Sequence, residues 1–242
     1  MEVDVRPDQR LQEAEYVTAL CRDPENPMAG AVLSGSPADP DFADYVGVLA
    51  ANPYVKGVRQ VLHVPEAGPG ACLQEAFVEG IRTLGRHGLS FDLCLRPSEL
   101  GDAARLAALC PDTRFVLDHC GNADPHVVAG EETEDGPFAH SADQWKSDMD
   151  ALGALPNVVC KVSGIVARAR PGWDAGTLAP TVEHCLAAFG PERAVFGGDW
   201  PVCNLGASYA EWATALRQII AGRSEEEQRR LLHDNAVAFY RL

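Results

Sequence analysis

The feature that most constrains the fold of this chain is a repeated alternation between short apolar, β-rich runs and helical stretches. Such alternation is typical of parallel sheets whose strands are joined by helices. Runs such as FVLD and NVVC are apolar at consecutive positions, as in strands that are buried on both faces. The predicted strands are residues 1–5, 28–35, 55–63, 91–97, 115–121, 157–164 and 194–202.

The segments between the later runs carry helix signals. Leu73, Phe77, Ile81 and Leu84 repeat at helical spacing, and the pattern stops near Gly88. No repeat, low-complexity tract or linker divides the chain, so we expect a single domain over residues 1–242. Capping boxes predict further helix starts near residues 142, 209 and 225, from the pairs Ser141 and Gln144, Ser208 and Glu211, and Ser224 and Glu227.

A doubly wound sheet and a closed barrel both satisfy this alternation. No G-x-G-x-x-G or G-x-x-x-x-G-K-[ST] loop follows any run, which disfavours a nucleotide-binding sheet. Four runs end in reactive polar residues followed by Gly or Pro, as strands of a barrel do when catalytic groups stand at their C-terminal ends. We therefore predict an α/β fold of the (β/α)8 TIM-barrel type. Seven strands are visible and the first begins at residue 1, so we expect the first barrel strand to be missing.

Composition excludes several classes of partner. The formal net charge of −15 disfavours binding to nucleic acid and to anionic lipid. No apolar run approaches the ~18 residues of a membrane span, and the N-terminus has no signal-peptide core, so we expect a cytoplasmic protein. The eight cysteines form no C-x2-C pair, which predicts buried free thiols rather than a metal or redox motif.

Two strand ends carry the main candidates for catalysis. His119 ends the run FVLDHCG, where an imidazole suits proton transfer or metal binding. Asp199 follows two glycines in AVFGGDWPV, which leave room for a close approach, and its carboxylate can activate water or bind a metal. The alternatives are a structural histidine and an N-cap aspartate. Period-two alternation places Asp118 on the face opposite to His119, where we expect it to anchor a loop or cap a helix.

Two basic residues point to an anionic partner. Arg59 on the run 55–63 would be costly to bury alone, so it requires either a substrate carboxylate or a protein acid. Lys161 either holds substrate oxygens or forms an internal ion pair. If one strand precedes the first run, Arg59, His119 and Asp199 fall on alternate strands, which contribute to the same interior layer of a barrel. The sequence therefore predicts that these three side chains converge on one pocket.

The segment 123–145 is long, acidic and rich in Gly and Pro. Loops of this size in a compact domain tend to be lids or binding loops. We expect this segment to cover or border the pocket.

Taken together, these segments resemble the amidohydrolase-related group of TIM-barrel hydrolases. Within that group the likeness is greatest to sugar-acid lactonases of the L-fuconolactonase type, and next to 2-pyrone-4,6-dicarboxylate lactonases. The resemblance implies hydrolysis of a small lactone by water at the mouth of the barrel. It rests on VKGVRQVLH, FDLCLRPSEL, FVLDHCGNAD, NVVCKVSG, FGPERAVFGGDWPV and NAVAFYRL, in family order.

The resemblance also implies roles for single residues. Asp199 matches the general base on the last strand, His119 matches the histidine of strand six, and Arg59 matches a substrate contact. Lys161 and Trp200 are further candidates for substrate binding. His119 and Asp199 would hold a divalent metal such as Zn2+ if one is bound; metal dependence varies within the group, so chemistry without a metal stays open. The D-x-H-x-H pair that the group carries on strand one has no match here.

Two other functions stay open at this point. One is a metal-dependent decarboxylase of the same superfamily, and the other is a non-catalytic, truncated remnant or scaffold. Loss of the first strand would leave two unpaired sheet edges. We therefore also expect poor solubility, or a homodimer formed through the gap.

Overall fold

Six strands form one parallel sheet, and their order in space follows their order in the sequence. The computed structural model describes residues 5–242, so nearly all of the strand predicted at residues 1–5 lies outside the described residues. The other six predicted strands are confirmed, each shorter than its apolar run. They are β1 (Ala31–Ser34), β2 (Val55–Val61), β3 (Ser90–Cys94), β4 (Arg114–Leu117), β5 (Val158–Val162) and β6 (Ala194–Phe196).

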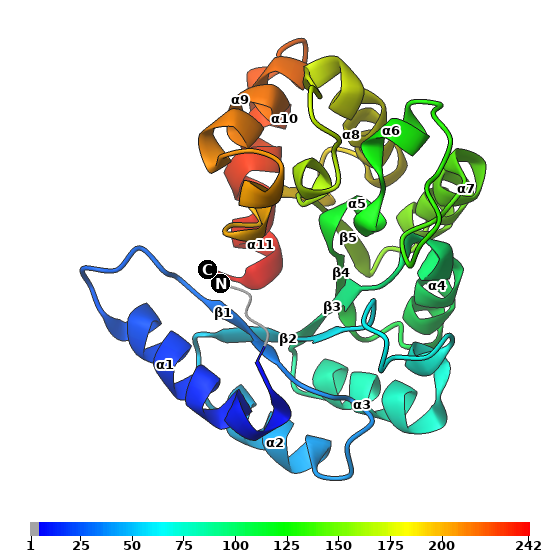
Figure 1. Ribbon diagram of the computed structural model, residues 1–242. Coiled ribbons are helices and arrows are strands. Elements are labelled where there is room, and N and C mark those ends of the chain that lie inside the picture. Colours follow the sequence, from blue (N-terminus) through cyan, green and yellow to red (C-terminus); the bar gives the residue numbers. More distant parts are fainter. Residues whose placement is uncertain (1–4) are drawn as a thin grey trace.

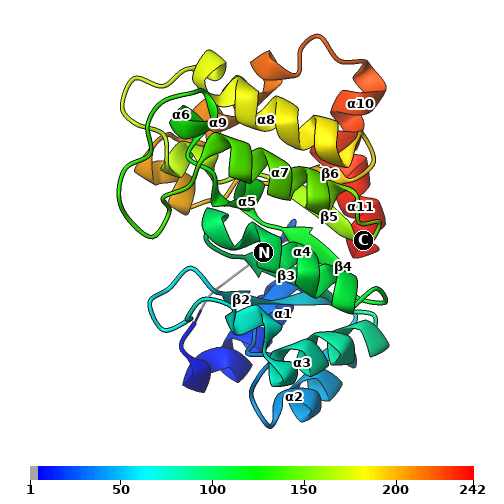
Figure 2. The same cartoon turned by 90° about the vertical axis from the view of Figure 1, so that its right-hand side faces the viewer.

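Helices follow the strands and lie around the outside of the curved sheet (Figure 1). In the side view, α3, α4, α7 and α8 succeed one another along the outer face of the sheet (Figure 2). The main helices are α1 (Arg10–Arg22), α2 (Phe42–Ala50), α3 (Glu75–Arg86), α4 (Leu100–Leu109), α7 (Ala142–Gly153), α8 (Ala175–Phe189), α9 (Tyr209–Ile219), α10 (Glu225–Arg229) and α11 (Asn235–Tyr240). Shorter turns are η1 (Pro7–Gln9), η2 (Ala71–Leu73), η3 (Pro97–Glu99), α5 (His119–Asn122), α6 (Pro125–Val128), η4 (Ile165–Ala167), η5 (Val202–Leu205) and the π-helical η6 (Arg230–Asp234).

The predicted capping residues begin three of these helices. Ser208 and Ser224 form complete capping boxes with the residues three positions later. Ser141 accepts a hydrogen bond from the backbone N–H of Gln144, so it also caps its helix. These local bonds satisfy N–H groups that a helix end otherwise leaves unpaired.

The two faces of the sheet differ in chemistry. The outer face is apolar and packs on the helices, with Phe91, Phe115 and Leu117 fully buried in the core. The inner face carries Asp92, Asp118 and Lys161, which are also buried. The strands are therefore buried on both sides, as the continuous apolar runs predicted, but charged side chains line the inside.

The sheet has the curvature and connectivity of a barrel, and it does not close within the described residues. There, β1 pairs only with β2, and β6 pairs only with β5. The C-terminal helix α11 lies against β6 through Asn235, whose side-chain amide donates hydrogen bonds to Pro191 O at 2.8 Å and Ala194 O at 2.7 Å. The NAVAFYRL segment therefore attaches the end of the chain to the last strand.

Replacement of this amide tests the attachment. Asn235→Ala leaves the buried carbonyl of Ala194 and the part-buried carbonyl of Pro191 without this donor, so we expect a loss of about 1–3 kcal/mol in the free energy of unfolding. Urea denaturation measures the loss. The exposed Gln218 on α9 provides the control, since Gln218→Ala should change stability by less than about 0.5 kcal/mol. Equal effects of the two substitutions would contradict the assigned role of Asn235.

Candidate active site

Charged and polar side chains from neighbouring strands meet at the C-terminal ends of the sheet. Arg59 stands on β2, Asp92 on β3 and Lys161 on β5. His119 follows β4, and Asp199 follows β6. Because all six strands are parallel, their C-terminal ends gather at one edge, which is where barrel enzymes place their reacting groups.

The imidazole of His119 reaches the site through an unusual backbone turn. Strand β4 ends at Leu117, and His119 has a left-handed backbone with a φ of 54°. A non-glycine residue in this region costs about 1–3 kcal/mol and persists only where the surroundings hold it. The turn directs Nδ1 to 2.8 Å from Ser163 Oγ and Nε2 to 3.7 Å from Asp199 Oδ1.

The structure corrects the expectation for Asp118. Strand alternation placed Asp118 away from the site, as a loop anchor or helix cap. Its side chain instead lies on the inner face with that of Lys161, and it makes no capping hydrogen bond to α5. Leu117 faces the helices, so simple alternation would have sent His119 to the outer side. Asp118 thus reaches the inner face by ordinary alternation, and the left-handed turn brings His119 to the same site.

His119 is a neutral imidazole at physiological pH. Burial lowers its pKa to about 3, and the positive charges of Arg59 and Arg168 and the neighbouring His63 act in the same direction. A neutral ring has one N–H and one acceptor nitrogen. If the Ser163 hydroxyl donates to Nδ1, the N–H stands on Nε2 and points toward the Asp199 side of the site.

Asp199 has the properties of a general base. Burial raises its pKa to about 6, and the nearby cations Arg59, Lys161 and Arg168 oppose the rise. A carboxylate with a pKa just below neutral is mostly ionised at pH 7 and still basic enough to accept a proton in a transition state.

The two glycines before Asp199 make room for protein side chains. A Cβ on Gly197 would lie 2.9 Å from Ser163 Cβ and 3.1 Å from Lys161 Cγ. A Cβ on Gly198 would lie 2.6 Å from Tyr209 Cε2. The close approach predicted from these glycines is therefore made by neighbouring residues that hold the Asp199 segment in place.

A buried ion-pair network on the inner face of the sheet adjoins the site. The Lys161 ammonium lies 2.9 Å from Asp92 Oδ2 and 2.9 Å from Asp118 Oδ1, and Asp118 Oδ2 lies 3.6 Å from Arg59 Nη1. Burial raises the pKa of Asp118 to about 7 and that of Asp92 well above its usual range, and it lowers the pKa of Lys161 to about 7. The sequence left two partners open for Lys161 and Arg59, a substrate or a protein acid. The structure shows both side chains paired with protein acids.

Asp92 was missed in the sequence, although one signal was present. It is the only acid inside the apolar run FDLCL, and an acid buried in a strand requires a cation nearby. The cation, Lys161, lies 69 residues further along the chain. Nothing local in the sequence identifies that pairing.

Arg59, His119, Lys161, Asp199 and Trp200 all line one cavity of about 810 Å3. The predicted convergence of Arg59, His119 and Asp199 therefore agrees with the geometry, while their chemical roles stay predictions. Trp200 is 68% exposed, so it stands at the edge of the cavity rather than within the polar cluster. The volume is large enough for a small-molecule ligand.

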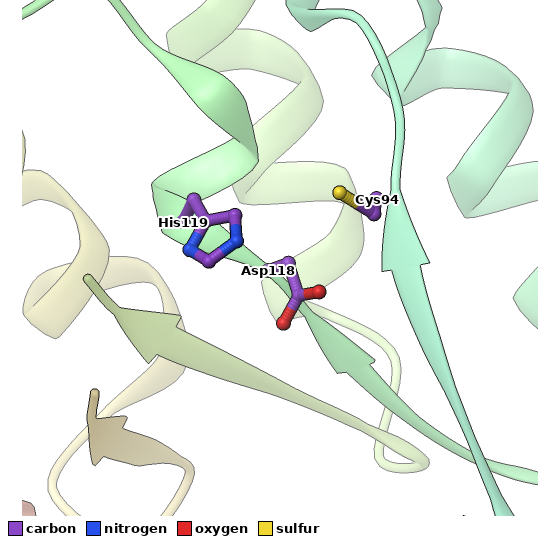
Figure 3. Close-up of side chains that lie close together, drawn as sticks. All are labelled: Cys94, Asp118 and His119. Atoms are coloured by element: carbon purple, nitrogen blue, oxygen red, sulfur yellow. The ribbon is translucent and has the colours of Figure 1, made fainter. Parts of the chain in front are cut away.

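Two sets of side chains are candidates for holding a metal ion. The ligand atoms of Cys94, Asp118 and His119 lie within 4.8 Å of one another (Figure 3). Asp118 is already bound to Lys161, however, and burial raises the pKa of the Cys94 thiol, which disfavours the thiolate. The spacing of the predicted pair, His119 and Asp199, fits a metal ion better. The 3.7 Å between His119 Nε2 and Asp199 Oδ1 is close to the ~3.3 Å that separates two ligands of a tetrahedral zinc.

This donor set is incomplete for catalytic zinc. Catalytic zinc sites usually have three protein ligands, and the His119–Asp199 pair supplies two from the described residues.

All eight cysteines are free and buried, as predicted. Among residues 5–242, no helix combines the length and apolar character that a membrane crossing requires.

Comparison with known proteins identifies the family. The amidohydrolase family model matches residues 2–242. The chain belongs to the amidohydrolase family. The resemblance that the motifs indicated is thereby confirmed.

Two sequence relatives align with most of this amidohydrolase. An L-fucono-1,5-lactonase of Burkholderia multivorans is 32% identical over 76% of the chain and 62% of its own length. An uncharacterized protein of Sinorhizobium fredii is 33% identical over 84% of the chain and 66% of its own length. The chain thus spans slightly less than two thirds of these relatives.

A solved structure supports the barrel type of the fold. An amidohydrolase from Burkholderia multivorans, with zinc bound, superposes with a TM-score of 0.82 at 28% identity. The match covers 96% of this chain and 80% of that protein. The six-stranded sheet is therefore an α/β sheet of the amidohydrolase barrel type.

The contact between Gly164 and His119 provides a test of how the imidazole is held. A Cβ on Gly164 would lie 2.6 Å from His119 Cβ, and Gly164 itself has a φ of 72°. Gly164→Ala should therefore move the imidazole and change its NMR resonances, with a loss of stability of about 1–3 kcal/mol or more. Gly70 has the same φ with nothing within 4 Å of its Cβ position, so Gly70→Ala measures the backbone strain alone. Identical stability losses, with unchanged His119 resonances in both variants, would show that Gly164 does not position the imidazole.

Proposed function

We propose that this amidohydrolase hydrolyses a small lactone, of the sugar-acid or carboxylated type, to the open hydroxy acid. The observation that carries the proposal is the pairing of a carboxylate with a pKa of about 6 and a neutral imidazole, 3.7 Å apart, at the edge of one cavity. The relative named L-fucono-1,5-lactonase supports the choice of a lactone as substrate.

The reaction needs one base and one hydrogen-bond donor. Asp199 accepts a proton from water as the water oxygen attacks the lactone carbonyl carbon. The Nε2–H of His119 donates to the carbonyl oxygen as negative charge develops there. When the ring C–O bond breaks, the proton on Asp199 passes to the leaving alkoxide. The sum is one water added and one ester bond broken.

Neighbouring residues keep these two groups in their required forms. The Ser163 hydroxyl bound to Nδ1 fixes the tautomer of His119, and the low pKa of the ring prevents an ion pair with Asp199. Arg59 and Lys161 favour the ionised form of Asp199. Trp200 would contact the substrate at the edge of the cavity.

A divalent ion such as Zn2+ would be held by Asp199 and by Nε2 of His119 in its other tautomer, in which the N–H stands on Nδ1 and donates to Ser163 Oγ. When bound there, it would supply an acidified water and polarise the carbonyl. The described residues supply two donors for such an ion, so the steps above are assigned to the side chains alone.

Substitution of the proposed base is the direct test. Asp199→Asn keeps the shape of the side chain and removes its basicity, so kcat should fall by about 10²- to 10⁴-fold while the fold is retained. A pH-indicator assay on L-fucono-1,5-lactone and related lactones measures turnover, and circular dichroism checks folding. Asp112→Asn, at an exposed position, is the control and should leave turnover unchanged. Equal activity of wild type and Asp199→Asn would remove Asp199 from the chemistry.

The pH dependence follows from the raised pKa of Asp199. The carboxylate is protonated and inactive below its pKa, so kcat/KM should rise with pH and level off above an apparent pKa of about 6. Initial rates between pH 4.5 and 8, corrected for spontaneous lactone hydrolysis, give this profile. A rate that is constant across this interval, or that falls as pH rises through 6, would exclude an ionised Asp199 as the base.

A further inference from the structure

A cation outside the ion-pair network is bonded to the turn that carries His119, although it is not itself among the residues that line the cavity of about 810 Å3. Arg168 follows η4, five residues after Ser163. Its Nη2 donates a hydrogen bond to Asn122 Oδ1 at 3.0 Å, and Asn122 ends the turn that carries His119. Arg168 is therefore attached to the same structural unit as the imidazole.

The contacts of Arg168 are uncharged. Its guanidinium carbon lies 3.3 Å from the centroid of the Phe138 ring, and that ring in turn lies 5.3 Å from the ring of His63. Within the part of the chain that the structure describes, no carboxylate forms an ion pair with Arg168. Arg170, two residues later, differs sharply, because it pairs with Glu131 at 2.6 Å and Asp124 at 3.8 Å.

The charge of Arg168 nevertheless acts on the reacting groups. It lowers the pKa of His119, and it opposes the rise in the pKa of Asp199. Arg168 is half-buried, and burial lowers its own pKa. A partly desolvated guanidinium without an acid gains more from an anionic ligand than a paired or fully hydrated one does.

The loop that carries Phe138 is consistent with a ligand at this position. The segment 131–137 is exposed and holds four acids, yet the side chain placed on Arg168 is an aromatic ring. A ring stacked on one face of a guanidinium leaves the N–H groups at its edge available for a carboxylate.

We propose that Arg168 is the specificity-determining residue of this site and binds a carboxylate on the lactone substrate. The substrate class is then an anionic lactone, such as the monolactone of an aldaric acid, rather than a neutral sugar lactone. The inference rests on the proposed lactonase function. It extends that function by assigning the charge of the substrate and the residue that recognises it.

Two lactones that differ at one carbon provide the test. D-glucaro-1,4-lactone carries a carboxylate where D-glucono-1,4-lactone carries a hydroxymethyl group. Wild type should prefer the carboxylated lactone. Arg168→Gln should lower kcat/KM for that lactone by about 10- to 100-fold, chiefly through KM, because a charge-assisted hydrogen bond is lost. The loss on the neutral lactone should be at least 10-fold smaller, because the effect of the Arg168 charge on His119 and Asp199 is common to both lactones and cancels in the ratio of the two kcat/KM values.

Two further variants separate recognition from general effects of charge or folding. Arg168→Lys keeps the charge and loses the planar fork, so it should restore part of the preference for the carboxylated lactone. Arg170→Gln removes a neighbouring arginine that is already paired, so the ratio of the two rates should stay at the wild-type value. An equal loss on both lactones in Arg168→Gln, or no loss on either, would overturn the proposal.

A binding measurement distinguishes failure of this inference from failure of the lactonase function. Titration calorimetry with D-glucarate, the open-chain diacid, reports carboxylate binding without turnover. If no lactone is hydrolysed but D-glucarate binds wild type and Arg170→Gln at least 10-fold more tightly than Arg168→Gln, the anion site stands and the lactonase function fails. If lactones are hydrolysed and D-glucarate binds all three proteins equally, the anion site fails alone.

Discussion

The candidate site depends on the bond of one buried ammonium group to two buried carboxylates. Lys161 joins Asp92 on β3 and Asp118 at the end of β4 to its own strand, β5, so three neighbouring strands share one network. Such a network contributes little net stability when complete, but loss of one member leaves an uncompensated charge at a cost of about 3–5 kcal/mol. The inner face of the sheet therefore accepts few substitutions, and the positions of the strand ends are held closely.

That rigidity allows the strained turn after β4. Asp118 is held by Lys161, and the next residue, His119, enters the left-handed region at once. Ser163 and Gly164 on the following βα connection then fix the imidazole, one by a hydrogen bond and the other by the lack of a side chain. The surrounding ion pairs and close contacts thus compensate the backbone strain of the turn that positions the imidazole. Backbone strain of this kind tends to occur at functional positions.

Charge is distributed unevenly between the surface and the site. The chain as a whole has a formal net charge of −15, but Arg59, Lys161 and Arg168 lie together near Asp199 and His119. Two of these cations pair with buried acids, while Arg168 is held by an amide and an aromatic ring. The acids Asp92, Asp118 and Asp199 balance these three cations, so the site does not share the strong negative charge of the whole chain. An anionic substrate of the proposed kind would therefore be recognised by the placement of single charges rather than by attraction to the surface.

The strand segments, the helix starts and the choice of His119 and Asp199 as neighbouring candidates followed from the sequence, because they depend on local patterns. Apolar runs report burial, capping residues satisfy neighbouring N–H groups, and a polar residue at a strand end stands near the mouth of a barrel. The partners of Lys161, the inward turn of His119 and the stacking of Phe138 on Arg168 required the tertiary structure. Each joins residues that are 30 to 69 positions apart, or depends on one backbone torsion that breaks the strand alternation, and no local pattern encodes either.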